Sequence, residues 1–153
     1  MKLYAARILE ERGISYRVIE LSDRALSIDD VIRFSKEPLM VDEICKTIIV
    51  KDRDGKKYAI LLLGNDRVDF AKAGKVIGSK LSIANPREVK EATGVEPGAV
   101  CPLLLKIPVY IDRRVTEKKR VNFGSGNHLY GIDMAFQDLA MVFEYTVVDV
   151  AEG

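Results

Sequence analysis

The sequence predicts an α+β fold, a single domain spanning residues 1–153 with a mixed β-sheet flanked by helices. Three observations support this prediction. A chain of 153 residues has the size of one ordinary domain and is long enough to bury a core. Short runs rich in β-branched residues alternate with amphipathic segments. No internal repeat, low-complexity stretch or linker divides the chain.

The first part of the chain predicts a helix, a strand and a second helix. Apolar residues fall near helical spacing over residues 2–12, and Gly13 ends that helix. Residues 15–21 alternate loosely and predict a strand. Ser27 can cap a short helix over residues 28–34, where two aspartates in the first turn suit the helix dipole.

A β-hairpin is predicted over residues 42–65, with a charged turn at residues 53–56. Both apolar runs are continuous, so we expect both strands to be covered on both faces. Lys46 does not fit this pattern, because it stands where the first strand begins. It is either a strand-end lysine whose ammonium reaches water along its own stem, or a cation at the mouth of a pocket whose floor is the hairpin.

The middle of the chain predicts a helix over residues 68–77, a strand over 80–84 and a further helix. Asn85 can cap that helix, Pro86 suits its first position, and Glu88 completes a capping box. The remaining strands are predicted at residues 103–105, 109–112, 121–123, 130–134 and 146–150, with a helix over 136–143. The run 113–120 is either a charged helix or a solvated loop.

The bulk numbers exclude several classes of function. Lys and Arg (24) nearly balance Asp and Glu (23), so no global basic field attracts DNA, and any RNA contact is local or assisted by another protein. Cys45 and Cys101 are isolated thiols without metal-ligand spacing, which favours a reducing, cytoplasmic location. Neither a signal peptide nor a membrane-spanning run is present, so no membrane partner is expected.

Two glycine-bearing loops are candidates for contacts with a ligand. The loop at residues 92–102 carries two glycines and two prolines within nine residues. Such a path can turn N–H groups toward an oxygen or phosphate, or it can be an ordinary tight connection. The second loop, residues 124–127, reads Gly-Ser-Gly-Asn and could cradle a ligand or form a plain turn.

Familiar cofactor and nucleophile motifs are missing. Neither loop is a Walker or dinucleotide motif, and Ser125 is not in a hydrolase elbow. His128 is the only histidine. A Ser125–His128 couple is conceivable, although a lone loop histidine is more often a surface residue. One histidine and two distant cysteines do not make a metal site. We therefore expect no cofactor and no metal.

Three motifs in order resemble one known family. These are Cys45-Lys46-Thr47-Ile48-Ile49-Val50, then Thr93-Gly94 followed by Gly98-Ala99-Val100-Cys101-Pro102, and finally Gly124-Ser125-Gly126-Asn127 followed by Gln137-Asp138-Leu139. Together they resemble the YbaK-type aminoacyl-tRNA editing family, which includes free-standing relatives of the editing domain of prolyl-tRNA synthetases. The resemblance runs from the first helix to the last strand. It implies a strongly twisted, barrel-like sheet.

The resemblance implies a trans-editing deacylase that hydrolyses the ester of a mischarged tRNA, a proline tRNA carrying alanine or cysteine in the best-known members. Lys46 and Gly98 match catalytic positions. Ala99, Cys101, Ser125, Gly126, Asn127 and Leu21 match or replace positions near the substrate. Ala99, Cys101, Asn127 and Leu21 depart from the family pattern, which leaves the choice of amino acid open.

The expected mechanism uses placement and charge rather than a general base. Lys46 would grip a phosphate or ribose or stabilise developing negative charge, and N–H groups near Gly98 and Ala99 would face the ester oxygen. The partner is the acceptor 3′ end of a mischarged tRNA, with tRNA identity supplied by a synthetase or elongation factor.

Two other functions remain as alternatives, and one surface needs explaining. The chain could be a non-catalytic module that binds the aminoacyl-tRNA 3′ end or a small acyl-adenosine, or an interaction domain without the site.

The basic residues Arg113, Arg114, Lys118, Lys119 and Arg120 are either a phosphate-touching patch or a solvated charged face.

Overall fold

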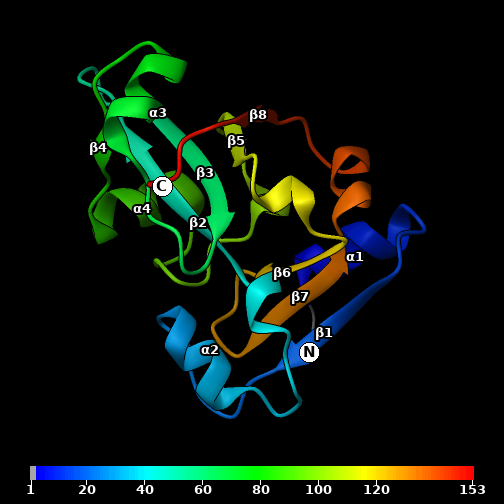
Figure 1. The fold of residues 1–153 in the computed structure, drawn as a ribbon. Coiled ribbons are helices and arrows are strands. Elements are labelled where there is room, and N and C mark those ends of the chain that lie inside the picture. Colours follow the sequence, from blue (N-terminus) through cyan, green and yellow to red (C-terminus); the bar gives the residue numbers. More distant parts are fainter. Residues whose placement is uncertain (1–2) are drawn as a thin grey trace.

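A computed structural model describes residues 3–153 and shows two β-sheets with four α-helices (Figure 1). The larger sheet has the strand order β4–β2–β3–β5–β8. Strand β2 pairs antiparallel with both β3 and β4, whereas β3–β5 and β5–β8 are parallel, so the predicted mixed sheet is confirmed. Its strands are Ser82–Ile83 (β4), Cys45–Lys51 (β2), Lys57–Leu63 (β3), Val109–Asp112 (β5) and Thr146–Val148 (β8).

The smaller sheet is antiparallel and has the order β1–β7–β6. Its strands are Tyr16–Glu20 (β1), Tyr130–Ala135 (β7) and Arg120–Gly124 (β6). A parallel bridge between Ile44 and Asn122 joins the two sheets. The α+β class holds, although the strands divide into two sheets that are not closed into a barrel.

The four α-helices begin and end at the signals in the sequence. They are Tyr4–Glu11 (α1), Ile28–Phe34 (α2), Phe70–Ile77 (α3) and Pro86–Thr93 (α4). The Ser27 side chain caps α2, and both halves of the predicted capping box are present at α4. Helix α3 starts two residues later than predicted because the Asp69 carboxylate accepts the N–H groups of Ala71 and Lys72. The predicted start of the first helix at residue 2 lies outside the described residues.

Several predicted elements are shorter or of another type. The predicted strand at 103–105 is wrong: Pro102–Leu104 forms a 3₁₀ turn (η2), because Pro102 has a fixed φ and no N–H for a ladder. The last predicted helix is a 3₁₀ segment, Phe136–Met141 (η4). The run 113–120 contains one 3₁₀ turn, Val115–Glu117 (η3), and Val41–Glu43 (η1) precedes β2. The last strand ends at Val148 rather than residue 150.

Strand β3 lies at the centre of the core and is covered on both faces, as predicted. Leu61 packs into the apolar cluster that also contains residues of the smaller sheet, while Ile60 and Leu62 pack into the cluster beneath α3. Each of these fully buried side chains stabilises the fold by about 1.5–3 kcal/mol. Strand β2 differs, because Lys46, Thr47 and Ile48 are only partly buried.

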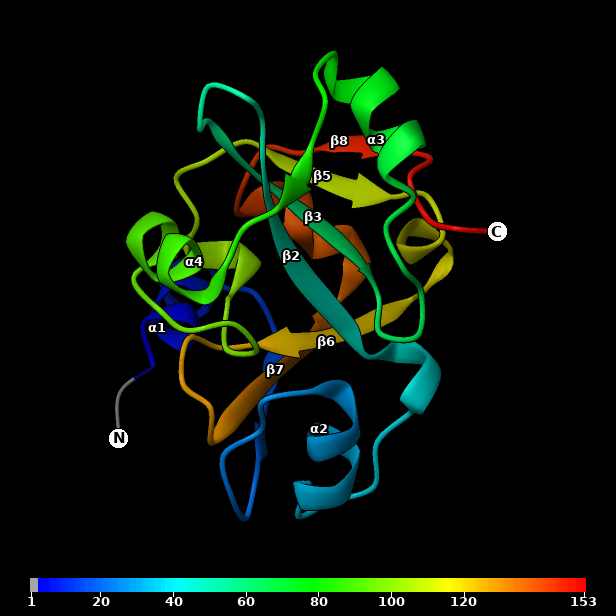
Figure 2. The same ribbon diagram turned by 90° about the vertical axis from the view of Figure 1, so that its left-hand side faces the viewer.

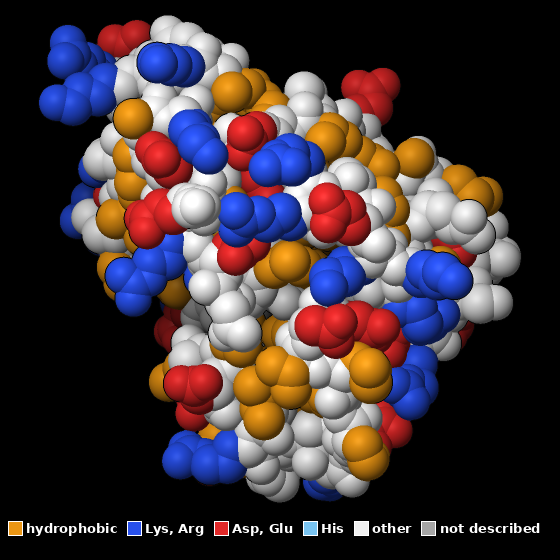
Figure 3. Space-filling model, in the orientation of Figure 1, with side chains coloured by type: hydrophobic (Ala, Val, Ile, Leu, Met, Phe, Trp, Pro, Cys, Tyr) orange, Lys and Arg blue, Asp and Glu red, His pale blue; other side chains and the backbone are white. Residues whose placement is uncertain are grey.

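The face of the molecule seen in Figure 3 has acidic and basic side chains intermixed rather than a field of one sign. This agrees with the formal net charge of +1. Over residues 3–153, no helix has the length and apolar character needed to cross a membrane.

Candidate functional site

A cavity of about 590 Å³ is bordered by β2, α2, the start of α4 and the loops after β1, α4 and β6. In Figure 2, β2 lies in the middle of the view, with α4 to its left and α2 below it. Apolar side chains, mainly isoleucine, leucine and valine, make up most of the wall. The residues with polar side chains that line it are Ser27, Lys46, Thr47, Asn85, Asn122, Asn127, His128 and Tyr130. No aspartate or glutamate within residues 3–153 lines the cavity, so a carboxylate general base is missing there.

Three loops at the cavity are joined by backbone hydrogen bonds. We call them the Leu26 loop (residues 21–27), the Gly98 loop (residues 94–101) and the Ser125 loop (residues 124–129). The Gly126 N–H donates to Ala99 O at 2.8 Å and joins the second and third loops. The Ala25 N–H donates to His128 O at 3.0 Å and joins the first and third. The wall made by these loops is therefore one connected unit.

Gly98 is required by the geometry of this unit. Its φ is +93°, a left-handed conformation that side chains rarely adopt. A Cβ at this position would also lie 3.1–3.2 Å from the backbone of Leu26. Gly98 lines the cavity, and its N–H donates no hydrogen bond within residues 3–153. The Ala99 N–H differs from the expectation that both face a ligand, because it donates to Glu96 O at 3.3 Å.

The Ser125 hydroxyl stabilises its own loop. It donates its proton to Tyr130 O at 2.7 Å, lies 3.1 Å from Asn127 O, and accepts the Asn127 N–H. The residue is 2% exposed and does not line the cavity. The conceivable Ser125–His128 couple is therefore not formed. Ser125 instead stabilises the loop whose residues Asn127 and His128 line the cavity.

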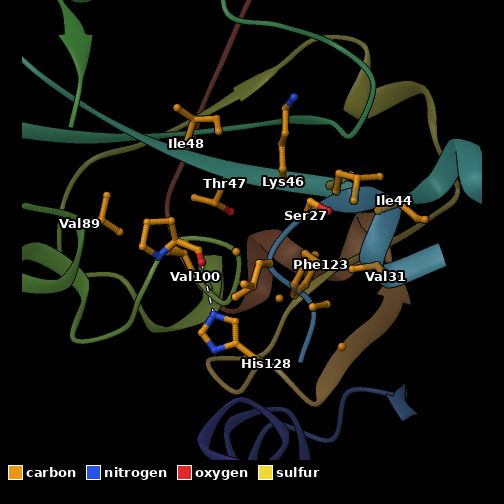
Figure 4. A pocket seen from close by; sticks show the side chains of 18 of the residues that line it. Ser27, Val31, Ile44, Lys46, Thr47, Ile48, Val89, Val100, Phe123 and His128 are labelled. Atoms are coloured by element: carbon orange, nitrogen blue, oxygen red, sulfur yellow. Dashed lines mark hydrogen bonds between the residues drawn. The ribbon is translucent and has the colours of Figure 1, made fainter. Parts of the chain in front are cut away.

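His128 connects the three loops through its ring. Nε2 lies 3.3 Å from Pro97 O, the contact dashed in Figure 4, and Nδ1 lies 3.5 Å from the Arg24 guanidinium. A proton on Nε2 faces the carbonyl and leaves the Nδ1 lone pair toward Arg24, so the neutral ring fits both contacts. Arg24 also pairs with Glu96 at 3.2 Å. The only histidine of the chain therefore borders the cavity, a role that its position in a loop did not indicate.

Strand β2 borders the cavity over five successive residues, from Cys45 to Ile49. A strand lines a cavity with successive residues when its edge, rather than one of its faces, lies along that cavity. Strand β4 pairs only with Val50 and Lys51, so within residues 3–153 β2 has a free edge between the Ile44–Asn122 bridge and that point. Ile49 O accepts the Ala84 N–H on this side. Because alternate residues direct their backbone groups to opposite sides, the N–H and C=O of Thr47 also face the free edge.

Thr47 adds an unsatisfied hydroxyl to this edge. Its Oγ1 is buried and makes no hydrogen bond within residues 3–153. Figure 4 shows the side chain on the side of β2 that faces Val100 and Phe123. A buried hydroxyl without a partner costs about 1–3 kcal/mol, so the Thr47 hydroxyl is available to hydrogen-bond a group that enters the cavity.

Lys46 projects from the other side of β2, together with Ile48 (Figure 4). Its side chain is half-buried, borders the cavity and forms no ion pair or hydrogen bond with residues 3–153. Burial lowers the pKa of the Lys46 ammonium, the charge of Asp66 opposes that shift, and Arg67 adds to it. The lysine therefore lies at the mouth of a pocket, although its ammonium points away from Phe123 and His128.

Both thiols are buried, and burial raises the pKa of each to about 12. They are therefore uncharged near neutral pH and are not prepared to act as nucleophiles. Cys45 borders the cavity, whereas Cys101, the last residue of the Gly98 loop, packs in the core and does not line the cavity.

The structure favours the charged-face interpretation of the basic run at residues 113–120. Four of its five cations are each paired with a carboxylate: Arg113 with Asp149, Arg114 with Asp66, Lys118 with Asp42 and Arg120 with Asp133. Lys119 alone has no ion pair within residues 3–153. None of the five lines the cavity.

The predicted site residues fall into two groups. Lys46, Gly98, Asn127 and Leu21 line the cavity together. Ala99, Cys101, Ser125 and Gly126 lie behind the wall and hold its loops. Sequence reasoning missed Thr47 and His128 as lining residues. The available sequence signal for Thr47 was its position directly after Lys46 in the first matched motif.

Comparisons with known proteins give a matching family model and several solved structures that resemble this chain. The model of the family described as the aminoacyl-tRNA editing domain matches residues 27–141. The crystal structure of the protein APE2540 is 26% identical over 96% of this chain and 98% of its own, with a TM-score of 0.86. A candidate trans-editing enzyme for prolyl-tRNA synthetase is also 26% identical, with all of both chains covered and a TM-score of 0.82. A protein from a study of epitope grafting onto scaffolds shares the fold at 24% identity and a TM-score of 0.84.

Proposed function

This chain belongs to the aminoacyl-tRNA editing domain family, and on that premise we propose that it hydrolyses the ester of a mischarged tRNA in trans. The observation that carries the proposal is the cavity, which combines apolar walls, a free strand edge and an unpaired lysine at its rim. Its volume of about 590 Å³ is in the usual range of small-ligand sites.

The substrate we propose is a proline tRNA that carries alanine or cysteine. The structurally similar protein described as a trans-editing enzyme for prolyl-tRNA synthetase supports this class. The lining supports it as well, because the side chains of Ile19, Val31 and Phe123 suit a small apolar amino acid. A charged amino acid would enter this wall without a counter-ion, which is costly.

The proposed mechanism depends on placement. The aminoacyl group enters the cavity along the free edge of β2, where the Thr47 hydroxyl and backbone groups hold its polar atoms. The Gly98 N–H donates to the ester oxygen as negative charge develops there. Lys46 at the rim binds the phosphate next to the terminal nucleotide. Ala99, Cys101, Ser125 and Gly126 support this wall, and Asn127 and Leu21 contact the substrate.

No carboxylate lines the cavity within residues 3–153, so a group of the substrate completes the chemistry. A hydroxyl of the terminal ribose is suitably placed to guide the attacking water, and the ester itself is reactive. Positioning alone then supplies much of the acceleration.

The lack of a carboxylate base in the cavity wall favours a second candidate function. A module that holds the aminoacyl-tRNA 3′ end without cleaving it would also need an apolar cavity, a free strand edge and a cation. It would not need a catalytic base.

A hydrolysis assay separates the two. Proline tRNA charged with alanine, cysteine or proline is incubated with the protein, and release of the amino acid is followed against spontaneous hydrolysis. We expect faster release of alanine or cysteine and not of proline. Binding of all three without faster release of any would establish the module instead.

A further inference from the structure

We propose that the hairpin lobe, which we define as residues 46–90, is the surface that receives the phosphate backbone of the tRNA acceptor stem. The inference rests on the proposed function, in which a mischarged tRNA is the substrate. It goes beyond that function by assigning a second contact, outside the cavity, to the double-stranded part of the substrate.

The first observation is an uneven distribution of charge along the chain. The hairpin lobe holds 11 of the 24 Lys and Arg residues but only 5 of the 23 Asp and Glu residues, a formal charge of +6. The rest of the chain, with 13 cations and 18 carboxylates, has a formal charge of −5. The net charge of +1 therefore conceals one basic segment, and a local basic field of this kind attracts nucleic acid.

The second observation is that ion pairs do not compensate this charge. Within residues 3–153, 8 of the 11 cations of the lobe have no carboxylate within 4.0 Å, whereas 9 of the other 12 cations have one. The unpaired cations of the lobe are Lys46, Arg53, Lys56, Lys57, Arg67, Lys75, Lys80 and Lys90. A cation without a carboxylate partner can exchange its counter-ion for a phosphate, and the release of counter-ions drives association with nucleic acid.

The third observation is the position of these cations relative to the cavity. Lys46 lies at the rim, and β2 leads from there to the turn between β2 and β3. Strand β4 pairs with β2 so that Ser82 is opposite Lys51. Lys80 and Arg53 are each two residues further toward the turn, so they lie at the same end of the sheet. In Figure 2, this turn lies above the part of β2 that borders the cavity.

The turn end of the sheet has a basic surface. Its exposed cations are Arg53, Lys56 and Lys80. Asp52 uses both carboxylate oxygens in hydrogen bonds to backbone N–H groups of the turn and to the Tyr58 hydroxyl, which leaves Asp54 as the exposed carboxylate of the turn. At the upper left of Figure 3, where Figure 1 shows this end of the sheet, Lys and Arg side chains project from the surface.

The spacing along β2 fits the shape of the substrate. A strand rises about 3.4 Å per residue, so the step from Lys46 to Lys51 spans about 17 Å. The unpaired 3′ end of the tRNA follows the free edge of β2 over this distance, and the paired stem lies at the turn end of the sheet. Proteins recognise an RNA duplex largely through its shape, phosphates and 2′-hydroxyls, so lysine and arginine side chains are sufficient for this contact.

The test uses the double variant Arg53→Gln and Lys80→Gln, which removes two exposed cations that form no ion pair or side-chain hydrogen bond within residues 3–153. Binding of an acceptor-stem minihelix that ends in CCA is measured at several salt concentrations. Affinity should fall about tenfold at about 0.1 M salt, and the slope of log K against log[salt] should become shallower by about 1.5, since each phosphate contact contributes about 0.7–0.9. Affinity for the CCA trinucleotide, which occupies only the cavity and the free edge of β2, should stay within about twofold.

In deacylation of alanine-charged proline tRNA, the double variant should lose kcat/KM through a higher KM at unchanged kcat, because the stem contact is made equally in the ground state and the transition state. Lys106→Gln with Lys119→Gln is the matched control. Both residues are exposed cations without an ion pair within residues 3–153, and both lie outside the lobe. This control removes the same charge and should keep the affinity and the salt dependence of the wild type.

The outcomes separate this proposal from the proposed function. Wild-type affinity for the minihelix in the lobe variant, or an equal loss in the control, overturns the proposal, and hydrolysis by the wild type would then stand without it. A loss confined to the lobe variant, in a protein whose wild type releases no amino acid from charged tRNA, supports the surface and refutes the hydrolysis.

Discussion

Two sets of basic side chains in this molecule have opposite surroundings. Along residues 113–120, four of five cations have a carboxylate within 3.5 Å, and none of the five borders the cavity. At the rim of the cavity, Lys46 is half-buried and has no such partner within residues 3–153. A paired surface charge is already compensated, whereas a desolvated, unpaired one gains most from an incoming anion.

Two aspartates show the same contrast. Asp112 is fully buried, and its carboxylate accepts the N–H groups of Val150, Ala151 and Arg114. These hydrogen bonds hold Val150 and Ala151 against the end of β5, and they leave no carboxylate oxygen of Asp112 free to bind a ligand. Asp66 has one oxygen without a donor. Within residues 3–153, the buried side-chain oxygens without a partner are those of Thr47, which lines the cavity, and of Asp66, which does not.

Replacing Lys46 by alanine should have the largest effect on activity. We expect kcat/KM for deacylation to fall about 100-fold or more, the usual cost of removing one electrostatic stabiliser from a site. Lys119→Ala is the matched control, since it removes the one unpaired cation of the basic run. Deacylation rates of both variants on alanine-charged proline tRNA check the comparison. Equal losses in the two variants would show that the surroundings of Lys46 do not matter.

Gly98→Ala should rank second. The new Cβ would press on the Leu26 backbone and displace the connected loops, so we expect about a 30-fold loss of kcat/KM, which corresponds to about 2 kcal/mol. Gly94→Ala is the control, because Gly94 has a φ of +81° but nothing within 4 Å of its Cβ. It should lose a similar stability through strain and keep its activity. If both variants lose activity equally, backbone strain alone explains the need for Gly98.

Thr47→Val tests the unsatisfied hydroxyl with a smaller effect. We expect about a tenfold loss of kcat/KM together with unchanged or higher stability, because no hydrogen bond is lost on folding. Thr93→Val should do the reverse, since the Thr93 hydroxyl donates to Val89 O and Val95 O. It should lose about 1 kcal/mol of stability and little activity. Thermal melts and kinetics on both variants give the comparison, and a Thr47→Val protein that melts at a lower temperature would argue against a ligand-binding role for the Thr47 hydroxyl.

Lys118→Glu should have the smallest effect on activity. It removes an ion pair with Asp42 and places two carboxylates together, which should cost under about 1 kcal/mol at the surface. We expect tRNA affinity and its salt dependence to stay within about twofold of the wild type. A clearly weaker affinity with a flatter salt dependence would restore the phosphate-patch interpretation.

The sequence was sufficient for most of the fold because its signals are local. Ser27, Asn85 and Gly78 mark helix ends through their own side chain or backbone, and the hairpin follows from two apolar runs and a turn. The division into two sheets was not predictable, since it depends on the distant bridge between Ile44 and Asn122. The 3₁₀ turn at Pro102 was missed because three consecutive leucines resemble a strand.

The site was predictable only in part. Lys46 stood out because a charge interrupts an apolar run, and Gly98 because its loop is rich in glycine and proline. Thr47 and His128 carried no such signal. Their importance follows from the free edge of β2 and from the Ala25–His128 and Gly126–Ala99 contacts, which join residues far apart in the chain. The ion-pair partners of the basic run could not be predicted either, because each carboxylate comes from a different segment of the chain.

The most direct measurement is a crystal structure with a non-hydrolysable substrate analogue, an alanine joined by an amide to the 3′ position of the terminal adenosine 5′-phosphate. The account predicts the alanyl group in the cavity beside Thr47, its carbonyl at the Gly98 N–H and the phosphate at Lys46. An analogue bound in the open groove at residues 105–110 and 140–146, with the cavity empty, would contradict it.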